Sequence, residues 1–180
     1  MAKKKEVNQL VFCKLFYLKK SIKAENGMKW VNHEILTGVI VYAVTEDFLS
    51  AAFSMAGAIF PDKVEGAPQA NFAVWRKRHR SWSHWPPLYL AFLGLLMSPV
   101  GSTMPRELLG IRKVGIFLMV GALLHIAEDA LCGKVPFLLP HKKVGIRLFK
   151  VGSTAEYLVT IGLILLVLFV AEYLKGGTYG

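Results

Sequence analysis

Histidine and carboxylate side chains lie within and at the ends of several apolar stretches of this 180-residue sequence. His125 and Asp129 are four residues apart, so on a helix they share a face and can reach one divalent ion from adjacent turns. His79 and His84 are five apart and would instead bind from a loop that leads into a helix. Three more residues of ligand type stand where apolar stretches begin or end: His33, Asp62 and Glu156.

These residue types suit a divalent metal. Zinc takes four nitrogen, oxygen or sulfur ligands, and a catalytic zinc keeps one position for water. Seven candidates exceed the needs of one ion and favour two ions close together. Each signal alone has a plainer explanation. A His/Asp pair on an apolar helix more often forms a hydrogen bond between helices, and the segment from Arg78 to His84 can be a basic loop with aromatic anchors.

The composition indicates a membrane protein. Hydrophobic residues make up 54% of the chain and charged residues 19%, with a formal net charge of +10. This hydrophobicity excludes a disordered chain and argues against a nucleic-acid-binding module, so no nucleic-acid partner is expected. Basic residues that flank apolar segments are typical of a protein embedded in a lipid bilayer. Cys13 and Cys132 form no CxxC motif and are interpreted as free thiols in a reducing compartment.

Three apolar stretches predict membrane helices. Residues 157–171 and 114–127 are uncharged and, with their flanks, approach the roughly 20 residues that cross a bilayer. Residues 81–105 also carry no Lys, Arg, Asp or Glu, and their helix should begin near Pro86 and stop near Pro99.

A fourth stretch, from Ile35 to Phe60, predicts a helical hairpin rather than one span. Two charges at mid-bilayer would be costly, whereas Thr45 suits an N-cap and the acids after it suit a first helical turn. The expected arms are 34–44 and 46–60, each short for an average bilayer. This hairpin puts 18 Lys and Arg residues on one side of the membrane and 4 on the other, whereas a single span gives 12 and 10. The positive-inside rule then places the basic side, and all the ligand-type residues, in the cytoplasm.

The sequence thus predicts an all-α polytopic membrane helical bundle: an N-terminal interfacial helix, the hairpin and three further membrane helices. Residues 1–30 form a basic amphipathic segment, residues 31–175 the membrane-embedded domain, and residues 176–180 a tail. The helix expected from Val7 to Ile22 either lies on anionic headgroups or packs on the protein, with equal weight for both.

The order of these motifs resembles the YdjM-like family of membrane-bound metal-dependent hydrolases. The matching elements are His33, Phe60-Pro61-Asp62, His79 to His84, Gly121 to Asp129 and Gly152 to Glu156. Two positions depart from the family pattern. Val64 stands at the second acidic position of an LPDxD-type motif, with Glu65 one residue late, and Trp85 replaces a small hydroxyl residue after His84. The family is in turn distantly similar to zinc-dependent phospholipases C, which are helical and use clustered His and Asp ligands.

The residues and the resemblance together predict a metal-dependent hydrolase with one or two divalent ions, zinc first. The metal ligands would be His33, Asp62, His79, His84, His125 and Asp129. Glu128 or Glu156 would act as base, and Arg80, next to Arg78, would hold a phosphate. The expected substrate is a phosphoester, with a phospholipid as one form.

Other functions stay open from the sequence. The chain can be a structural or assembly protein, part of an oligomer or larger complex, whose cluster binds a structural metal or only joins helices. Transport ranks lowest, because the ionisable residues gather at one end instead of along a path. The resemblance implies a bacterial or phage-encoded protein of the inner membrane, with the site facing the cytoplasm.

Overall fold

The computed structural model describes residues 28–66, 80–99 and 105–176. Most of these residues are helical, as expected. The α-helices are α2 (Trp30–Thr45), α3 (Phe48–Glu65), α5 (Pro86–Met97), α7 (Leu109–Cys132) and α8 (Thr154–Gly176). Two short 3-10 helices, η1 (Trp82–His84) and η2 (Arg106–Leu108), precede α5 and α7. The predicted N-terminal interfacial helix lies outside the described residues.

Helices α2 and α3 form the predicted hairpin, with longer arms than expected. At 1.5 Å per residue, 16 and 18 residues give arms of about 24 and 27 Å. The turn differs from the prediction in one residue: Asp47, not Thr45, is the N-cap of α3 and accepts hydrogen bonds from the backbone of Leu49 and Ser50. Glu46 takes a left-handed conformation and ends α2.

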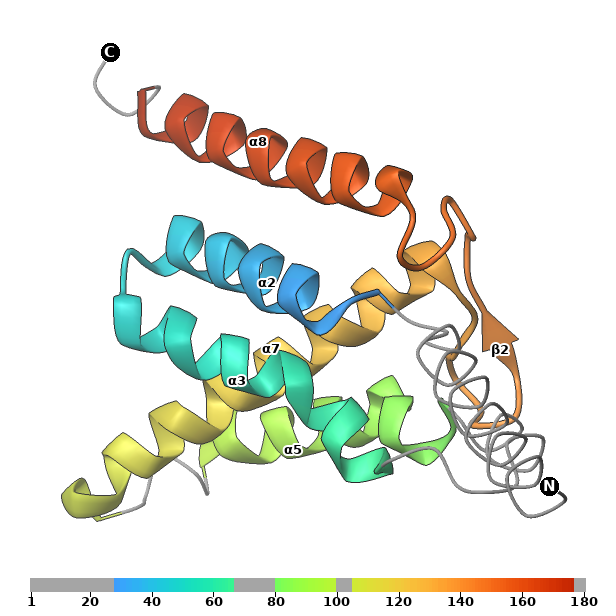
Figure 1. The fold of residues 1–180 in the computed structure, drawn as a ribbon. Helices are drawn as coiled ribbons and strands as arrows, with labels where there is room; N and C mark the ends of the chain where they lie inside the picture. Colours follow the sequence, from blue (N-terminus) through green and yellow to red (C-terminus); the bar gives the residue numbers. More distant parts are fainter. Residues whose placement is uncertain (1–27, 67–79, 100–104, 177–180) are drawn as a thin grey trace, which may run out of the picture.

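Two ion pairs fix the hairpin turn against the long helices. Lys113, near the start of α7, lies 2.7 Å from Asp47, and Lys175, near the end of α8, lies 2.5 Å from Glu46. The turn therefore lies at the level where α7 begins and α8 ends. The other ends of all four helices meet at the opposite end of the bundle, where the ligand-type residues lie (Figure 1).

Helices α3 and α7 pack unusually closely because two glycines face the partner backbone. A Cβ atom at Gly57 would lie 2.2 Å from the carbonyl oxygen of Leu118, and one at Gly121 would lie 1.9 Å from that of Ser54. The Ser54 hydroxyl donates to the carbonyl of Phe117 across the same contact, at 3.1 Å. Small residues allow such an approach between helices in a membrane.

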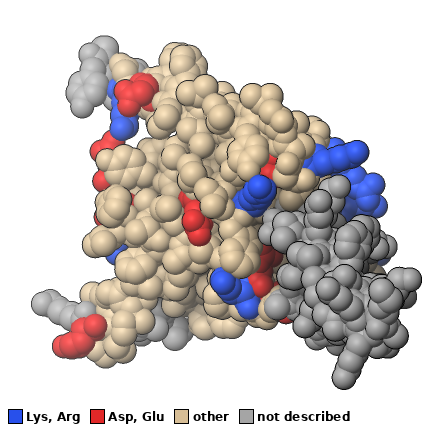
Figure 2. Space-filling view, in the orientation of Figure 1, with Lys and Arg blue, Asp and Glu red and all other residues tan. Residues whose placement is uncertain are grey.

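Two helices, α7 and α8, are long and apolar enough to cross a membrane. Helix α5 is apolar but has 12 residues, so it is about 18 Å long and too short to span alone, unlike the full membrane helix expected there. Helix α8 lies along α2 at the edge of the bundle, and most of its apolar side chains are exposed (Figure 1). Uncharged residues cover most of the face shown in Figure 2, with separate charged groups of both signs in its middle and at its edges, and Lys and Arg gather near the end that carries the strands.

A small β-hairpin departs from the all-α prediction. Strand β1 (Val135–Pro136) pairs antiparallel with β2 (Lys143–Val144). The chain after β2 returns to the end of α7, where the amides of Ile146 and Leu148 donate to backbone carbonyls of that helix. Strands of two residues have no alternation that a sequence pattern can reveal.

Candidate metal centre

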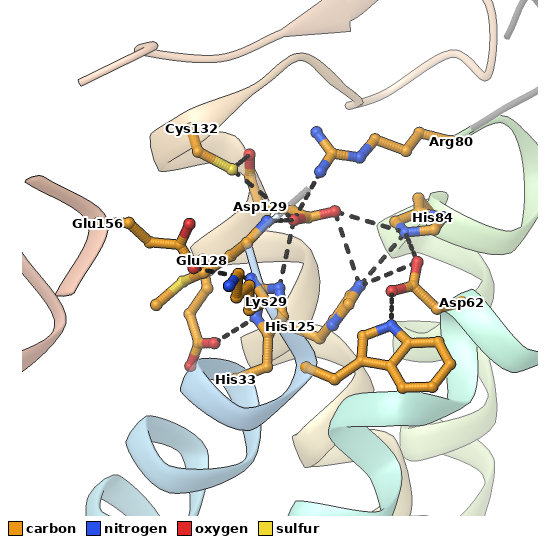
Figure 3. Close-up of polar contacts among 12 residues, drawn as sticks. Lys29, His33, Asp62, Arg80, His84, His125, Glu128, Asp129, Cys132 and Glu156 are labelled. Atoms are coloured by element: carbon orange, nitrogen blue, oxygen red, sulfur yellow. Dashed lines mark hydrogen bonds and ion pairs between the residues drawn. The ribbon is translucent and has the colours of Figure 1, made fainter. Parts of the chain in front are cut away.

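Five ligand-type side chains from four separate elements converge in the interior at one end of the bundle (Figure 3). They are His33 on α2, Asp62 on α3, His84 on η1, and His125 and Asp129 on α7. All except Asp62 are almost fully buried, and the Asp62 side chain is 19% exposed. Ionisable groups are costly to bury without partners, so the cluster requires an explanation.

Four atoms of this cluster lie close together. They are Oδ1 of Asp62, Nε2 of His84, Nε2 of His125 and Oδ2 of Asp129. Five of the six distances that join them lie between 3.2 and 3.7 Å. A tetrahedral zinc with bonds of 2.0–2.1 Å has ligand atoms about 3.3–3.4 Å apart. These five distances are therefore close to the spacing that a zinc ion requires, whereas Asp62 and Asp129 fall in separate metal-binding groups.

His33 lies beside these four residues and is oriented by a carboxylate. Its Nδ1 is 2.6 Å from Oε2 of Glu128, whose other oxygen accepts from the Thr37 hydroxyl at 3.1 Å. Its Nε2 is 3.3 Å from Oδ1 of Asp129 but has no hydrogen-bond partner among the described residues. A carboxylate on one ring nitrogen and a free second nitrogen is the usual arrangement of a metal-binding histidine.

Neighbouring side chains orient two of the ligands in the same way. The indole N–H of Trp30 donates to Oδ2 of Asp62 at 2.7 Å, so Oδ1 is left to face His84 and His125. Nδ1 of His84 lies 2.9 Å from the Ser83 hydroxyl. His125 lacks such a contact, because its Nδ1 has no hydrogen-bond partner within the described part of the chain.

A family model for the YdjM inner membrane protein matches residues 28–178. The chain belongs to the YdjM family. The match covers every helix that contributes to the cluster. No curated protein and no solved structure matched the chain.

Two overlapping groups in this YdjM-family chain could hold a metal ion: one with His33, His125 and Asp129, and one with Asp62, His84 and His125. His125 belongs to both, but a single imidazole nitrogen has one lone pair and can serve one ion. The described residues therefore fit one ion better than the two that seven candidates suggested. His79, a predicted ligand, lies outside the described residues.

Arg80 contacts the cluster at Asp129. Its Nη2 lies 2.7 Å from Oδ1 of Asp129, and the whole residue is buried. Its Nε has no hydrogen-bond partner in the described ranges. Glu65 holds the backbone of Arg80, which is in the left-handed region, by accepting from its amide at 3.1 and 3.2 Å. Glu65 also accepts from the Ser83 hydroxyl, so it supports the loop that carries His84. It belongs to neither metal-binding group.

Lys143 on β2 adds a second positive charge near this loop. Partial burial lowers the pKa of Lys143, the negative charge of Glu65 opposes that shift, and the positive charge of Arg80 adds to it. Glu65 and Arg80 are thus the charged groups whose fields act on Lys143. Arg80 and Lys143 together make this side of the centre favourable for an anion.

Glu156, which the sequence suggests as a possible base, is held by three N–H donors. Its Oε1 accepts from the Lys29 amide at 2.8 Å and from Nδ2 of Asn32 at 2.5 Å, and its Oε2 accepts from the Gly152 amide at 2.5 Å. The side chain is fully buried among these donors and belongs to neither metal-binding group. Glu156 therefore connects the start of α8 to Lys29, just before α2, and to Asn32, the residue before His33.

Sequence reasoning missed three residues that shape the site: Trp30, Asn32 and Thr37. Trp30 and Thr37 each contact a carboxylate next to a histidine, and Asn32 contacts Glu156. The only available signal was their place within one helical turn of His33, since residues three and four apart share a face.

Proposed function

We propose that this protein is a metal-dependent hydrolase whose centre lies at the cytoplasmic end of a membrane-embedded bundle. The observation that carries the proposal is the buried cluster of Asp62, His84, His125 and Asp129, in which Nε2 of each histidine lies 3.2–3.7 Å from a carboxylate oxygen of each acid. A divalent ion bound there would lower the pKa of a coordinated water and so supply hydroxide near neutral pH.

The residues around the ion then have distinct tasks. Asp62, His84, His125 and Asp129 would hold it, and His33 would be a further ligand oriented by Glu128. Zinc in catalytic sites can expand to five ligands, so His33 and a water compete for the fifth position. Glu128 is the carboxylate that can receive a proton, because it contacts Nδ1 of His33 directly, whereas all of the contacts of Glu156 serve to position the chain.

The proposed substrate is a phosphoester. Arg80 already contacts a carboxylate oxygen of the centre, and its Nε–H, which has no hydrogen-bond partner among the described residues, is a buried donor for a phosphate oxygen. The positive charge of Lys143 would also attract the phosphate. Because the bundle lies in the bilayer, phospholipids are the first phosphoesters to screen.

Metal content tests the centre. Detergent-purified wild-type protein should contain about one zinc, manganese or iron ion per chain by elemental analysis, and His125→Ala/Asp129→Ala should contain none. His141→Ala is the matched control, because His141 is an exposed histidine outside both groups and its loss should leave metal content unchanged. Folded wild-type protein that holds no metal and takes up no added zinc would refute the proposal.

A structural metal is the second candidate function, favoured by one observation: the ligands come from four elements that the ion would tie together. Arg80→Gln separates the two functions. If phospholipid hydrolysis falls while metal content and the unfolding temperature stay at wild-type levels, the centre is catalytic. If no phosphoester is hydrolysed by the metal-loaded wild type, and removal of metal only unfolds the protein, the structural function is correct.

A further inference from the structure

A second feature at the same end of the bundle is an open groove of about 780 Å³ between the end of α7 and the segment that leads into α8. This volume lies within the range of pockets that hold small ligands. Its lining includes Cys132, Arg147, Leu148, Phe149, Lys150 and Val151. The groove is distinct from the metal centre but adjacent to it, since the Cys132 thiol lies 3.4 Å from the backbone oxygen of Asp129.

The charge of the groove is positive and not neutralised. Arg147 and Lys150 are exposed, and within the described residues neither forms an ion pair. Residues 130–155 contain five Lys or Arg residues and no Asp or Glu. The next acid along the chain, Glu156, is buried and fully engaged by three N–H donors. Two cations that line one groove can both donate hydrogen bonds to an anion such as a phosphate.

The other part of the groove is apolar. Phe149 is buried at 7% exposure and packs in the core with Met28 and Leu36, while Leu148 is 59% exposed. The groove lies directly before Thr154, where the spanning helix α8 begins, so it is at the level of the membrane boundary. A free phosphate would use the cations and leave these apolar side chains in water, whereas a lipid would use both.

We propose that this groove binds an anionic phospholipid. The phosphate is held by Arg147 and Lys150, and the first acyl carbons lie on Leu148, Phe149 and Val151. A lipid can be bound here whether or not the neighbouring centre hydrolyses it, so the inference does not depend on the proposed function. Metal content is measured on the same samples, so a failure of the lipid-binding proposal can be told apart from a failure of the proposed function.

Cys132 is a reporter inside the groove. In a Cys13→Ser background, the rate of alkylation of Cys132 by N-ethylmaleimide is measured in dodecyl maltoside micelles as phosphatidylglycerol is added. Bound lipid should slow alkylation, and zwitterionic phosphatidylcholine at the same mole fraction should slow it much less. Each Lys or Arg near anionic lipid contributes about 1 kcal/mol, so Arg147→Ala/Lys150→Ala should raise the half-protecting mole fraction about 30-fold.

The control variant is Lys134→Ala/Lys142→Ala, which removes the same charge from the same segment but leaves the groove lining intact. It should retain wild-type protection. Equal protection by both lipids, an unchanged response of the groove variant, or protection by inorganic phosphate alone would each overturn the proposal. If Cys132 is unreactive even without lipid, the amount of phosphatidylglycerol that copurifies with the protein is measured instead. Equal amounts with the wild type and with Arg147→Ala/Lys150→Ala would overturn the proposal.

Discussion

Replacement of Gly121 by alanine should damage the metal centre although Gly121 has no side chain that could bind an ion. The added Cβ would lie 1.9 Å from the carbonyl oxygen of Ser54, and real Cβ atoms do not approach such atoms closer than 3.0 Å. Because that oxygen is backbone, no side chain can rotate away. Helices α3 and α7 must therefore separate by about 1.1 Å at this contact.

This separation acts directly on the ligands. Asp62 is carried by α3, whereas His125 is carried by α7, one helical turn beyond Gly121, and their ligand atoms are now 3.7 Å apart. Metal sites tolerate deviations of about 0.2 Å in ligand distance. We therefore expect metal affinity to fall at least about 10–100-fold, the cost of losing one orienting contact, and stability to fall by about 1–3 kcal/mol from overpacking.

The assay is metal content by elemental analysis together with thermal unfolding of the detergent-purified protein. Gly162→Ala on α8 is the control, since a Cβ there meets nothing within 4 Å and alanine has the higher helix propensity. That variant should keep its metal and its unfolding temperature. If Gly121→Ala also keeps both at wild-type values, the inference that close α3–α7 packing positions the centre is wrong.

Three further changes have distinct expected outcomes. Glu128→Gln removes the carboxylate that orients His33 and should weaken metal binding about 10–100-fold in a zinc-competition titration, with the fold retained by circular dichroism. Glu156→Gln replaces one carboxylate oxygen by an NH2 group, so at least one buried N–H donor loses its acceptor; stability should fall by about 1–3 kcal/mol, with normal metal content once the protein is folded, and loss of metal instead would give Glu156 a place in the centre. The hydrogen bond from Lys113 lowers the pKa of Asp47, so its stabilising effect is complete above the ordinary Asp pKa of about 3.9 and is lost as the pH falls below it. Acid unfolding of Lys113→Met should therefore lack this component, and an unchanged acid limb would contradict the assignment.

The convergence of the ligands could be predicted from the sequence because two independent constraints agreed. Two acids in the middle of one apolar stretch required a hairpin, and the distribution of Lys and Arg placed its open end with the segment that carries His84 and with the helix end that carries Asp129. At that end His33 and His84 each lie near Asp129, and His84 also lies near Asp62.

The roles of individual acids could not be predicted, because spacing along a chain does not reveal competing donors. Glu65 is one residue beyond the expected acidic position, which turns it about 100° around α3 and directs it to the Arg80 amide. Glu156 has the expected place at the start of α8, but Gly152, with a φ of 71°, bends the preceding turn so that its amide faces the carboxylate. Neither the turn nor the donors leave a pattern in the residue types.

The arrangement of ligands along the chain also implies an order of assembly in the cell. Chains emerge and fold from the N-terminus during synthesis, and the whole cluster, from His33 to Asp129, precedes α8. The centre can thus close before the last helix enters the membrane. None of the five clustered side chains comes from α8, but its Glu156 accepts hydrogen bonds from Lys29 and Asn32, just before His33. The last helix to be made therefore stabilises the position of the first helix of the site.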